Sequence, residues 1–267
     1  MTTADKASWR PRVVGQQPDL LLQPASGPAL VLVHVPAGET VIGDEGLDGR
    51  GSGSSSPRHH LWVDDYYIGK HPVTVEQFVA FAQATEYRRY LTDKTAQGCH
   101  PVQHIDWYGA QAFCAWLADT TGQAVRLPTE AEWEKAARGA DGRRYPWGNA
   151  SPDVSRCNYG NPRAKTTAVG QYSPAGDSPY GCADMAGNVW EWTASLWGRD
   201  WRTAEYGYPY SATDGRESLD AGVAWRRVVR GGSYADDETL VRCACRLGFS
   251  PYTHNVAIGF RIAVSLP

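Results

Sequence analysis

Helical periodicity marks three stretches of the chain, and each has recognisable start and stop signals. The first stretch covers Val75–Ala84. Thr74 stands directly before it and Gln77 three positions later, an arrangement in which each side chain caps the other residue's backbone N–H group. The pattern predicts a helix over Val75–Ala84.

A second helix is predicted between Asp106, a favourable N-cap residue, and Gly122, a typical C-terminal stop. Its apolar residues recur at i, i+3, i+4 and i+7 and form one stripe: Ala110, Phe113, Cys114 and Leu117. Because Cys114 belongs to this stripe, we expect its thiol to lie in the core and not to act as a nucleophile.

The third helix begins with a capping box made by Thr129 and Glu132, and Gly139 ends it. Three acids stand near its start: Glu130, Glu132 and Glu134. By composition they resemble a catalytic cluster. Carboxylates in a first turn also stabilise a helix by complementing its dipole, and we interpret these acids in that way.

Shorter apolar segments are typical of strands. Leu30–Val35 is a β-branched run that predicts a buried strand, continued by Thr40–Gly43. Leu61–Ile68 alternates roughly and predicts another strand, and Val228–Val229 begins a short one near the C-terminus. Gly-, Pro- and aromatic-rich stretches separate these segments. Strands mixed with a few helices and long irregular connections predict an α+β fold.

Composition supports one loop-rich domain. The chain has 267 residues, of which 42% are hydrophobic and eleven are Trp, enough to build a sizeable core. Residues 1–28 show little periodicity, and we expect a loosely ordered N-terminal arm there. No low-complexity linker divides the chain after residue 57, so residues 29–267 are predicted to form the single domain.

Charge and hydropathy exclude two classes of partner. A formal net charge of −3 argues against nucleic-acid binding, which requires a basic surface. The longest apolar run, residues 29–36, is too short to span a bilayer. The first residues lack the basic and apolar regions of a signal peptide, so we expect a cytoplasmic location.

Six cysteines in a chain of this length do not indicate a disulfide framework. None of them has the C-x-x-C spacing of a structural zinc site, and we expect reduced, mostly buried thiols. If Cys243 and Cys245 lay on one strand, both thiols would point to the same face and could bind one soft metal ion.

The stretch Gly181–Trp192 combines two Gly, two Trp and two carboxylates in twelve residues. Glycine at this density predicts a backbone that turns tightly. Asp184 and Glu191 would then lie in a rigid, partly buried loop, where a carboxylate needs a cation or several hydrogen-bond donors. Calcium, a hard cation that prefers oxygen ligands, would meet that need. The alternative is a loop whose two acids accept backbone N–H bonds.

The end of this stretch, Gly-Asn-Val-Trp-Glu-Trp at 187–192, resembles the hallmark of the formylglycine-generating (sulfatase-modifying factor) family. The resemblance extends from about Val35 to Val264, through further motifs in the same order: residues 67–74, 100–107, 126–133, 145–149, 230–233 and 259–261. It implies the formylglycine-generating-enzyme, C-type-lectin-like α+β fold. It also implies a structural calcium site formed by Asp184, the carbonyls of Gly187 and Val189, and Glu191.

The resemblance further implies where catalysis should occur. Formylglycine-generating enzymes use two cysteines, five positions apart, directly after a Gly-Gly-Ser motif. They bind copper and use oxygen to oxidise a cysteine of a client protein. Here Ala235, Asp236 and Asp237 stand at that place, and Asp cannot replace the thiolates that Cu(I) requires. A copper-dependent enzyme would have to use Cys243 or Cys245, and this stays the alternative function.

Residues 230–261 also resemble the C-terminal variable region of proteins diversified by retroelements on the same scaffold. Such proteins end in Arg-Gly-Gly-Ser, a variable segment and Gly-Phe-Arg. Their Asn codons mutate at adenines and cannot yield Lys, Gln, Glu, Met or Trp. From Ser233 to Ile258 only Glu238 is of these types, which are common elsewhere in the chain.

The resemblance therefore predicts a ligand-binding protein whose ligand is another protein. Aromatic and short polar side chains are typical of adaptable binding surfaces. The predicted surface consists of Tyr234, Asp236, Asp237, Leu247, Phe249, Tyr252, Thr253, His254 and Asn255, with a contribution from residues 197–210. The alternative is an ordinary strand–loop–strand with Phe249 and Tyr252 in the core.

Overall fold

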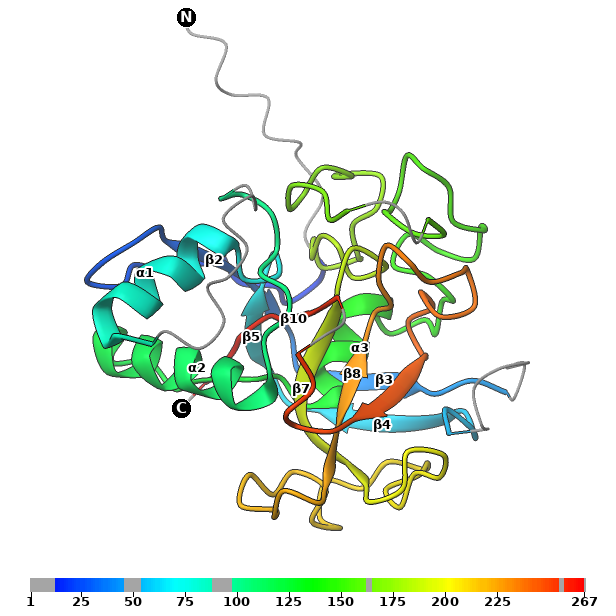
Figure 1. The fold of residues 1–267 in the computed structure, drawn as a ribbon. Helices are drawn as coiled ribbons and strands as arrows, with labels where there is room; N and C mark the ends of the chain where they lie inside the picture. Colours follow the sequence, from blue (N-terminus) through cyan, green and yellow to red (C-terminus); the bar gives the residue numbers. More distant parts are fainter. Residues whose placement is uncertain (1–12, 46–53, 88–97, 162–164, 255–256, 267) are drawn as a thin grey trace, which may run out of the picture.

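The structure is a computed structural model that describes residues 13–45, 54–87, 98–161, 165–254 and 257–266 (Figure 1). Within these ranges the chain forms eleven short strands and three helices. In chain order they are β1 (Leu20–Leu22), β2 (Leu30–Val35), β3 (Gly38–Ile42), β4 (His59–Val63), β5 (Tyr66–Gly69), α1 (Val75–Thr85), α2 (Trp107–Thr121), β6 (Val125–Arg126), α3 (Glu130–Arg138), β7 (Trp190–Gly198), β8 (Arg226–Arg230), β9 (Arg246–Phe249), β10 (Ile258–Phe260) and β11 (Ala263–Ser265). This confirms the α+β class.

The strands form three sheets, with the orders β1-β2-β5-β11-β6, β10-β7-β8-β9 and β3-β4. β10 pairs with β7 in parallel, and the remaining strand pairs are antiparallel. The last ten described residues supply β10 to one sheet and β11 to another. The C-terminus therefore joins the two larger sheets and holds the framework together (Figure 1).

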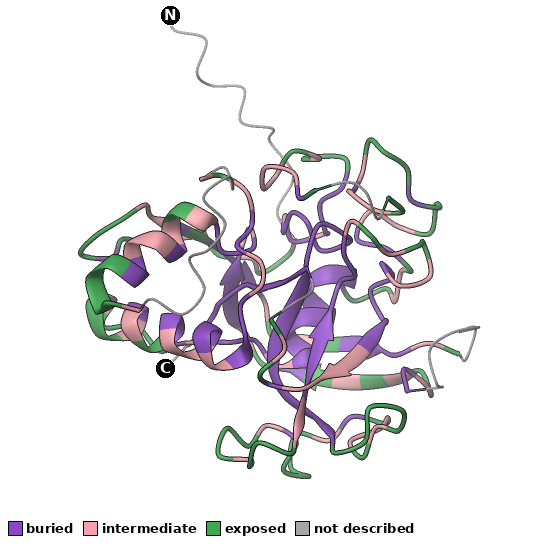
Figure 2. Ribbon diagram, viewed as in Figure 1, coloured by how far each residue is buried: buried purple, intermediate pink, exposed green. Residues whose placement is uncertain are grey.

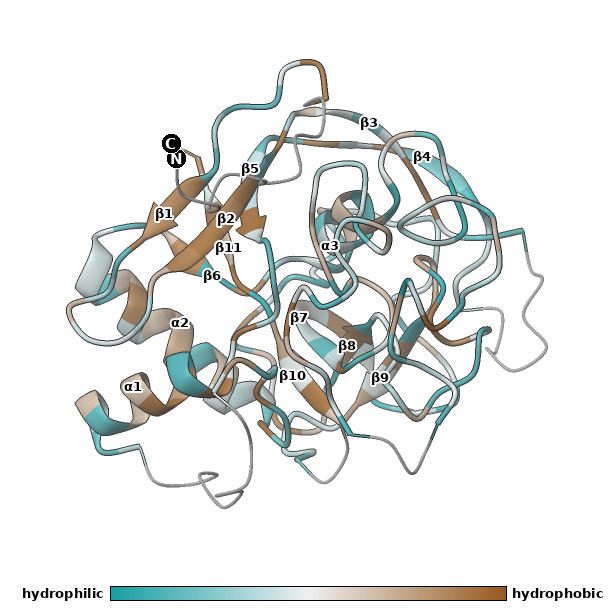
Figure 3. Ribbon diagram, turned by 90° about the horizontal axis from the view of Figure 1, so that it is seen from above, coloured by the Kyte–Doolittle hydropathy of each residue, from teal (hydrophilic) through white to brown (hydrophobic). Residues whose placement is uncertain are grey.

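The five-stranded sheet is covered on both faces. Neighbouring residues of β2 belong to different core clusters: Leu32 packs with Phe78 and Phe113 of α1 and α2, and Val33 packs with Trp133 of α3. Successive side chains of a strand point to opposite faces, so α1 and α2 lie on one face and α3 on the other. Figure 2 shows the buried residues gathered on these central strands, and Figure 3 shows the same strands as the most hydrophobic part of the chain.

The structure confirms the three predicted helices. Thr74 caps α1 and Thr129 caps α3 in capping boxes, and the Asp106 carboxylate accepts a hydrogen bond from the N–H group of Gly109 at the start of α2. Cys114 is buried in the apolar core, as its place in the stripe predicted. These elements depend on contacts within a few residues, which is why periodicity and capping signals located them.

The structure connects the predicted strand segments in a different way from the one expected. Residues 61–68 are not one strand, because the chain leaves the β3–β4 hairpin at Asp64, which is exposed, and enters the five-stranded sheet as β5. β3 pairs with β4 and does not continue β2. Leu20–Leu22 forms β1 against β2, so part of the segment assigned to an N-terminal arm belongs to the sheet.

Candidate functional site

The predicted calcium loop gives Glu191 partners from the protein itself. Glu191 lies in β7 and is fully buried. The Arg261 guanidinium donates from Nε to Oε2 at 2.6 Å and from Nη2 to Oε1 at 2.7 Å, and Trp133 Nε1 donates to Oε2 at 2.7 Å. Both carboxylate oxygens are therefore already engaged. A calcium ion bound through Glu191 would have to compete with Arg261, so Glu191 does not fit as a calcium ligand in this arrangement.

Asp184 lies in the same loop, in the left-handed backbone region at φ 55°. Its carboxylate accepts a hydrogen bond of 2.6 Å from the N–H group of Gly170, and burial raises its pKa to about 6. Gly187 has φ 75°, and a Cβ there would meet the Asn158 carbonyl oxygen at 2.2 Å, so only glycine fits. Among the described residues, no group of three or more His, Cys, Asp or Glu side chains is placed to hold a metal ion. Calcium binding through Asp184, Gly187 and Val189 stays a prediction.

Cys243 and Cys245 do not lie on a strand, because β9 begins at Arg246. Both thiols are buried, and they belong to different core clusters: Cys243 packs with Trp133 and Cys245 with Trp192. Burial raises the pKa of the Cys243 thiol to about 12. Sharing one soft metal ion would require both thiols to lie on one face of a strand. The structure does not place them so, and this expectation is wrong.

The predicted ligand-binding residues lie around β9, at the edge of its sheet. All but one are described, and each of these is partly or fully exposed: Tyr234, Asp236, Asp237, Leu247, Phe249, Tyr252, Thr253 and His254. Asn255 lies outside the described residues. The framework residues between them, such as Cys243 and Arg246, are buried. The region thus alternates between residues that build the fold and residues that reach its surface.

Two of these residues hold the loop before β9 in shape. The Asp236 carboxylate accepts hydrogen bonds from the Ser233 N–H group at 2.9 Å, the Ser233 hydroxyl at 2.5 Å and Trp190 Nε1 at 2.8 Å. The Asp237 carboxylate accepts hydrogen bonds from the N–H and hydroxyl groups of Thr239. Asp236 therefore ties the loop to β7, a structural role that sequence reasoning missed.

The sequence left open whether the apolar and aromatic residues of this region form a binding surface or belong to the core, and the structure shows some of each. Leu247 and Phe249 are half-buried and pack against the larger core cluster. Tyr252 is 44% exposed, and its ring lies 5.1 Å from that of Tyr108 on α2. Phe249 thus contributes to the core, whereas Tyr252 belongs to an aromatic pair at the surface.

Sequence reasoning also missed a buried ionic network around α3. Glu130 is fully buried, and its carboxylate oxygens lie 2.7 and 2.8 Å from Arg246 and 3.2 Å from Arg216. Glu134 is equally buried and pairs with Arg138 at 2.6 Å and with Arg230. Glu130 and Glu132 do stand in the first turn of α3, as the dipole interpretation requires, whereas Glu134 lies beyond it. That interpretation missed the second role of Glu130 and the main role of Glu134, which is to neutralise buried arginines. Arg230 of the Arg-Gly-Gly-Ser motif was the available signal.

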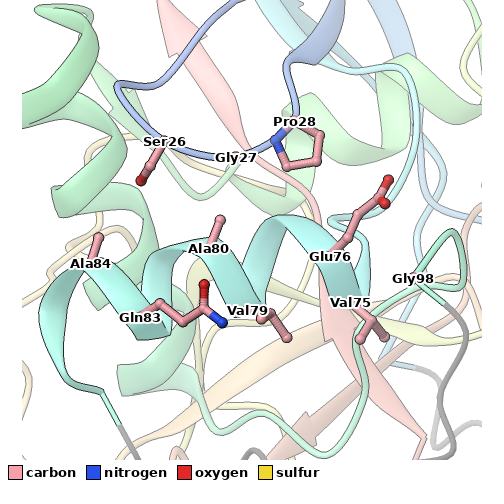
Figure 4. A pocket seen from close by; sticks show the side chains of 10 residues that line it. All are labelled: Ser26, Gly27, Pro28, Val75, Glu76, Val79, Ala80, Gln83, Ala84 and Gly98. Carbon is pink, nitrogen blue, oxygen red and sulfur yellow. The ribbon is translucent and has the colours of Figure 1, made fainter.

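Two cavities are formed by described residues of the chain. The larger, of about 720 Å³, is an open groove between residues 26–28 and the outer side of α1, where Val75, Val79 and Ala80 line it (Figure 4). The smaller, of about 300 Å³, lies between residues 54–56 and the connection after β7. Five residues that line the smaller cavity belong to the stretch 197–210, which was predicted to contribute to the binding surface: Arg202, Thr203, Ala204, Gly207 and Tyr208. The described C-terminal residues of that surface line neither of these two cavities. In the described part of the chain, no helix has the length and apolar character needed to cross a membrane.

Comparison with known proteins assigns the chain to a family. The sulfatase-modifying factor enzyme 1-like domain model matches residues 19–266. The serine/threonine-protein kinase pkn1 of Chlamydia pneumoniae is 34% identical over 79% of this chain, and the match covers 34% of the kinase. The chain thus spans about a third of the length of that relative. The formylglycine-generating enzyme of Thermomonospora curvata is 30% identical over 87% of this chain and 92% of the enzyme.

Solved structures agree with this assignment at the level of the fold. PvdO from Pseudomonas aeruginosa superposes with a TM-score of 0.70 at 21% identity, covering 91% of this chain and 99% of PvdO. Variable protein 1 of Treponema denticola also gives 0.70, at 24% identity, covering 93% and 99%. The similar proteins thus include enzymes as well as a variable protein. The chain belongs to the family of sulfatase-modifying factor enzyme 1-like domains and has the formylglycine-generating-enzyme, C-type-lectin-like fold.

Proposed function

We propose that this domain is a non-catalytic binding protein that presents the C-terminal surface around β9 to a protein ligand. We further propose that residues 230–261 are diversified between copies of the gene. The observation that carries the proposal is the exposure pattern: every described C-terminal residue of the predicted surface is partly or fully exposed, while Cys243 and Arg246 between them are buried. In the stretch 197–210, by contrast, Trp197 and Tyr210 are buried. Such a division would let the surface change without changing the fold.

The geometry of the surface supports a protein as the ligand. β9 is an edge strand; in the sequence the loop of Tyr234 precedes it, and Tyr252, which pairs with Tyr108, follows it. Aromatic side chains provide contact area at low entropic cost, and short polar side chains add adaptable hydrogen bonds. Thr253 and His254 supply such polar groups next to Tyr252. The neighbouring surface is thus mixed apolar and polar, as protein-binding surfaces are.

The structure narrows the set of residues that would vary. Asp236 accepts three hydrogen bonds that shape its loop, so most replacements there would disturb the scaffold. Tyr234, Leu247, Phe249 and residues 252–254 form the remaining contact surface. We therefore expect variation at these positions and constancy at Asp236.

The copper-dependent alternative has less support. Cys243 and Cys245 are buried in separate clusters, and burial raises the pKa of Cys243 to about 12. Copper sites and catalytic cysteines require an accessible thiolate. An apparatus for oxidising a client cysteine would need a thiol pair that the described surface around Asp236 does not provide.

The first test is made on the gene. The coding region for residues 230–261 is sequenced from independent isolates, together with the adjoining DNA. A near-copy whose differences all fall at adenines, with changes at Tyr234, Leu247 and Tyr252 and none at Asp236, would support diversification. Identical sequences with no near-copy would refute it.

The second test concerns binding. A photo-reactive phenylalanine analogue is introduced at Tyr252 and, as a matched control, at Val154, which is 87% exposed and is not a residue of the predicted surface. A cross-linked protein obtained from position 252 and not from position 154 is the expected result. Equal cross-linking at both positions, or none at 252, would contradict a ligand-binding role for the C-terminal surface.

A further inference from the structure

The smaller cavity is polar, and its described lining contains no residue of β9 or of the segment that follows β9. It has a volume of about 300 Å³, the lower end of the range for small-molecule sites. Two segments line it: Ser54 and Ser56 before β4, and residues from Arg202 to Tyr208 in the connection between β7 and β8. That connection is drawn in yellow and gold at the bottom of Figure 1.

A buried arginine fixes the two walls relative to each other. Arg246 Nη1 donates to the Ser54 carbonyl oxygen at 3.1 Å and to the Tyr206 carbonyl oxygen at 3.0 Å, so one guanidinium joins both walls. The guanidinium carbon of Arg246 also lies 4.6 Å from the centre of the Tyr208 ring, which lines the cavity. The cavity is therefore preformed and does not require a ligand to assemble it.

The electrostatic environment favours an anion. Arg202 lines the cavity, and none of the described lining residues is acidic. Two acids of the same loop already have partners: Glu205 pairs with Arg199 at 3.1 Å, and the Asp200 carboxylate accepts a hydrogen bond of 2.9 Å from the Arg202 N–H group.

Hydroxyl groups provide further donors. Ser54 and Thr203 line the cavity, and each hydroxyl can donate one hydrogen bond. The Ser56 hydroxyl donates to the Asp44 carbonyl oxygen and the Tyr208 hydroxyl to Glu134, so these two stabilise the walls instead. Arg202, Ser54 and Thr203 line the same cavity, and together they offer a donor set suited to a phosphate group, because arginine can form two parallel charge-assisted bonds to its oxygens.

We propose that this cavity binds the phosphate group of a small organic phosphate, through Arg202, Ser54 and Thr203. The phosphate itself would fill only part of the cavity, and the remaining space beside Ala204 and Gly207 would take the group that carries it. This site is independent of the proposed function, and either can fail without the other.

The test is a calorimetric titration of the purified protein at pH 7.5 and constant ionic strength. The probes are glucose 6-phosphate, O-phosphoserine, inorganic phosphate and, as the neutral control, glucose. At this pH phosphate monoesters are mostly dianions. We expect saturable binding of at least one organic phosphate, tighter than that of inorganic phosphate, and no binding of glucose. The better of the two organic probes then identifies the source of the phosphate as a sugar or a phosphorylated side chain.

Two variants locate the site. Arg202→Gln should weaken binding roughly tenfold or more, as expected for the loss of charged hydrogen bonds. Arg156→Gln is the matched control, because Arg156 is also an arginine stacked on a tryptophan but lies outside the cavity. Arg202 is exposed, so its replacement leaves the fold intact. Binding unchanged in Arg202→Gln, equal binding of glucose, or no saturable binding up to about 10 mM, where any affinity is under about 3 kcal/mol, would overturn the proposal.

Discussion

The segment from β8 to Tyr252 contains two kinds of residue that differ in almost every physical respect. On its inner side, Arg230 and Arg246 are buried and neutralised by carboxylates of α3. On its outer side, Leu247, Phe249 and Tyr252 are partly exposed and make no ionic contacts. Arg246 and Leu247 are neighbours in β9, and successive side chains of a strand point to opposite faces. The two roles are therefore separated between adjacent residues. Stability is concentrated on one side, which leaves the other free to change.

The largest expected effect comes from breaking the inner side. Replacing Arg246 with Met should lower the free energy of unfolding by about 3–5 kcal/mol, because Glu130 keeps its charge in the interior with one arginine fewer. Denaturant-induced unfolding measures the change. The control Arg199→Met removes an exposed pair with Glu205 and should cost under about 1 kcal/mol. Equal losses in the two variants would show that the network does not stabilise the fold.

The second effect is a pH dependence of the free energy of unfolding, which arises from Glu217 in the connection between β7 and β8. Burial raises the pKa of Glu217 to about 7, although Tyr210 and Ser195 donate hydrogen bonds to its carboxylate. Between pH 5 and 7 the folded state therefore keeps a proton that the unfolded chain has released, so the free energy of unfolding falls as pH rises and levels off above pH 7. The contribution is on the order of 3 kcal/mol.

Glu217→Gln should remove most of that pH dependence and leave the variant more stable than the wild type at pH 8. Thermal or denaturant unfolding from pH 5 to 8 provides the measurement. Glu238→Gln, at an exposed acid on the outer side, should leave the pH profile unchanged. A pH profile in Glu217→Gln that is unchanged from that of the wild type would contradict the assignment.

A third, smaller effect tests where the boundary between the two sides lies. Asp236→Ala should cost about 1–3 kcal/mol, because it removes the acceptor of hydrogen bonds from Ser233 and Trp190. Asp237→Ala removes a turn contact with Thr239 at an exposed position and should cost less, under about 1 kcal/mol. Urea unfolding of both variants decides the question. A larger loss for Asp237 would place the boundary elsewhere in the loop.

The smallest effect on stability is expected at the centre of the outer surface. Tyr252→Ala removes an aromatic pair with Tyr108 and should cost about 0.5–1.5 kcal/mol, with no change in the circular dichroism spectrum. Its main consequence should be the loss of ligand binding. A loss of stability comparable to that of Arg246→Met would mean that Tyr252 is a core residue.

Sequence signals located the local structure of the framework. The helices were predicted with their caps at Thr74, Asp106 and Thr129, because capping and amphipathic periodicity depend on residues within a turn or two of each other. The family was predicted for a related reason, since its short motifs fix turns and caps in a set order. The match to residues 19–266 agrees with that prediction.

The sequence predicted the candidate site less well than it predicted the framework. Asp236 was predicted as a surface residue, and its hydrogen bond to Trp190 joins residues 46 positions apart. Cys243 and Cys245 were weighed as partners on one strand, whereas the turn before β9 directs them into different core clusters. Neither outcome has a local signature, because each depends on which distant segments pack around the loop.

The chain by itself thus determined its helices, its α+β class and its family. Only the tertiary structure decided the role of each charged residue. Glu130 looks like an ordinary first-turn acid in the sequence, and it becomes the partner of Arg246, 116 residues away, once α3 is enclosed by the C-terminal strands. The physical reason is that burial makes an unneutralised charge very costly, and only the folded chain determines which charges are buried together.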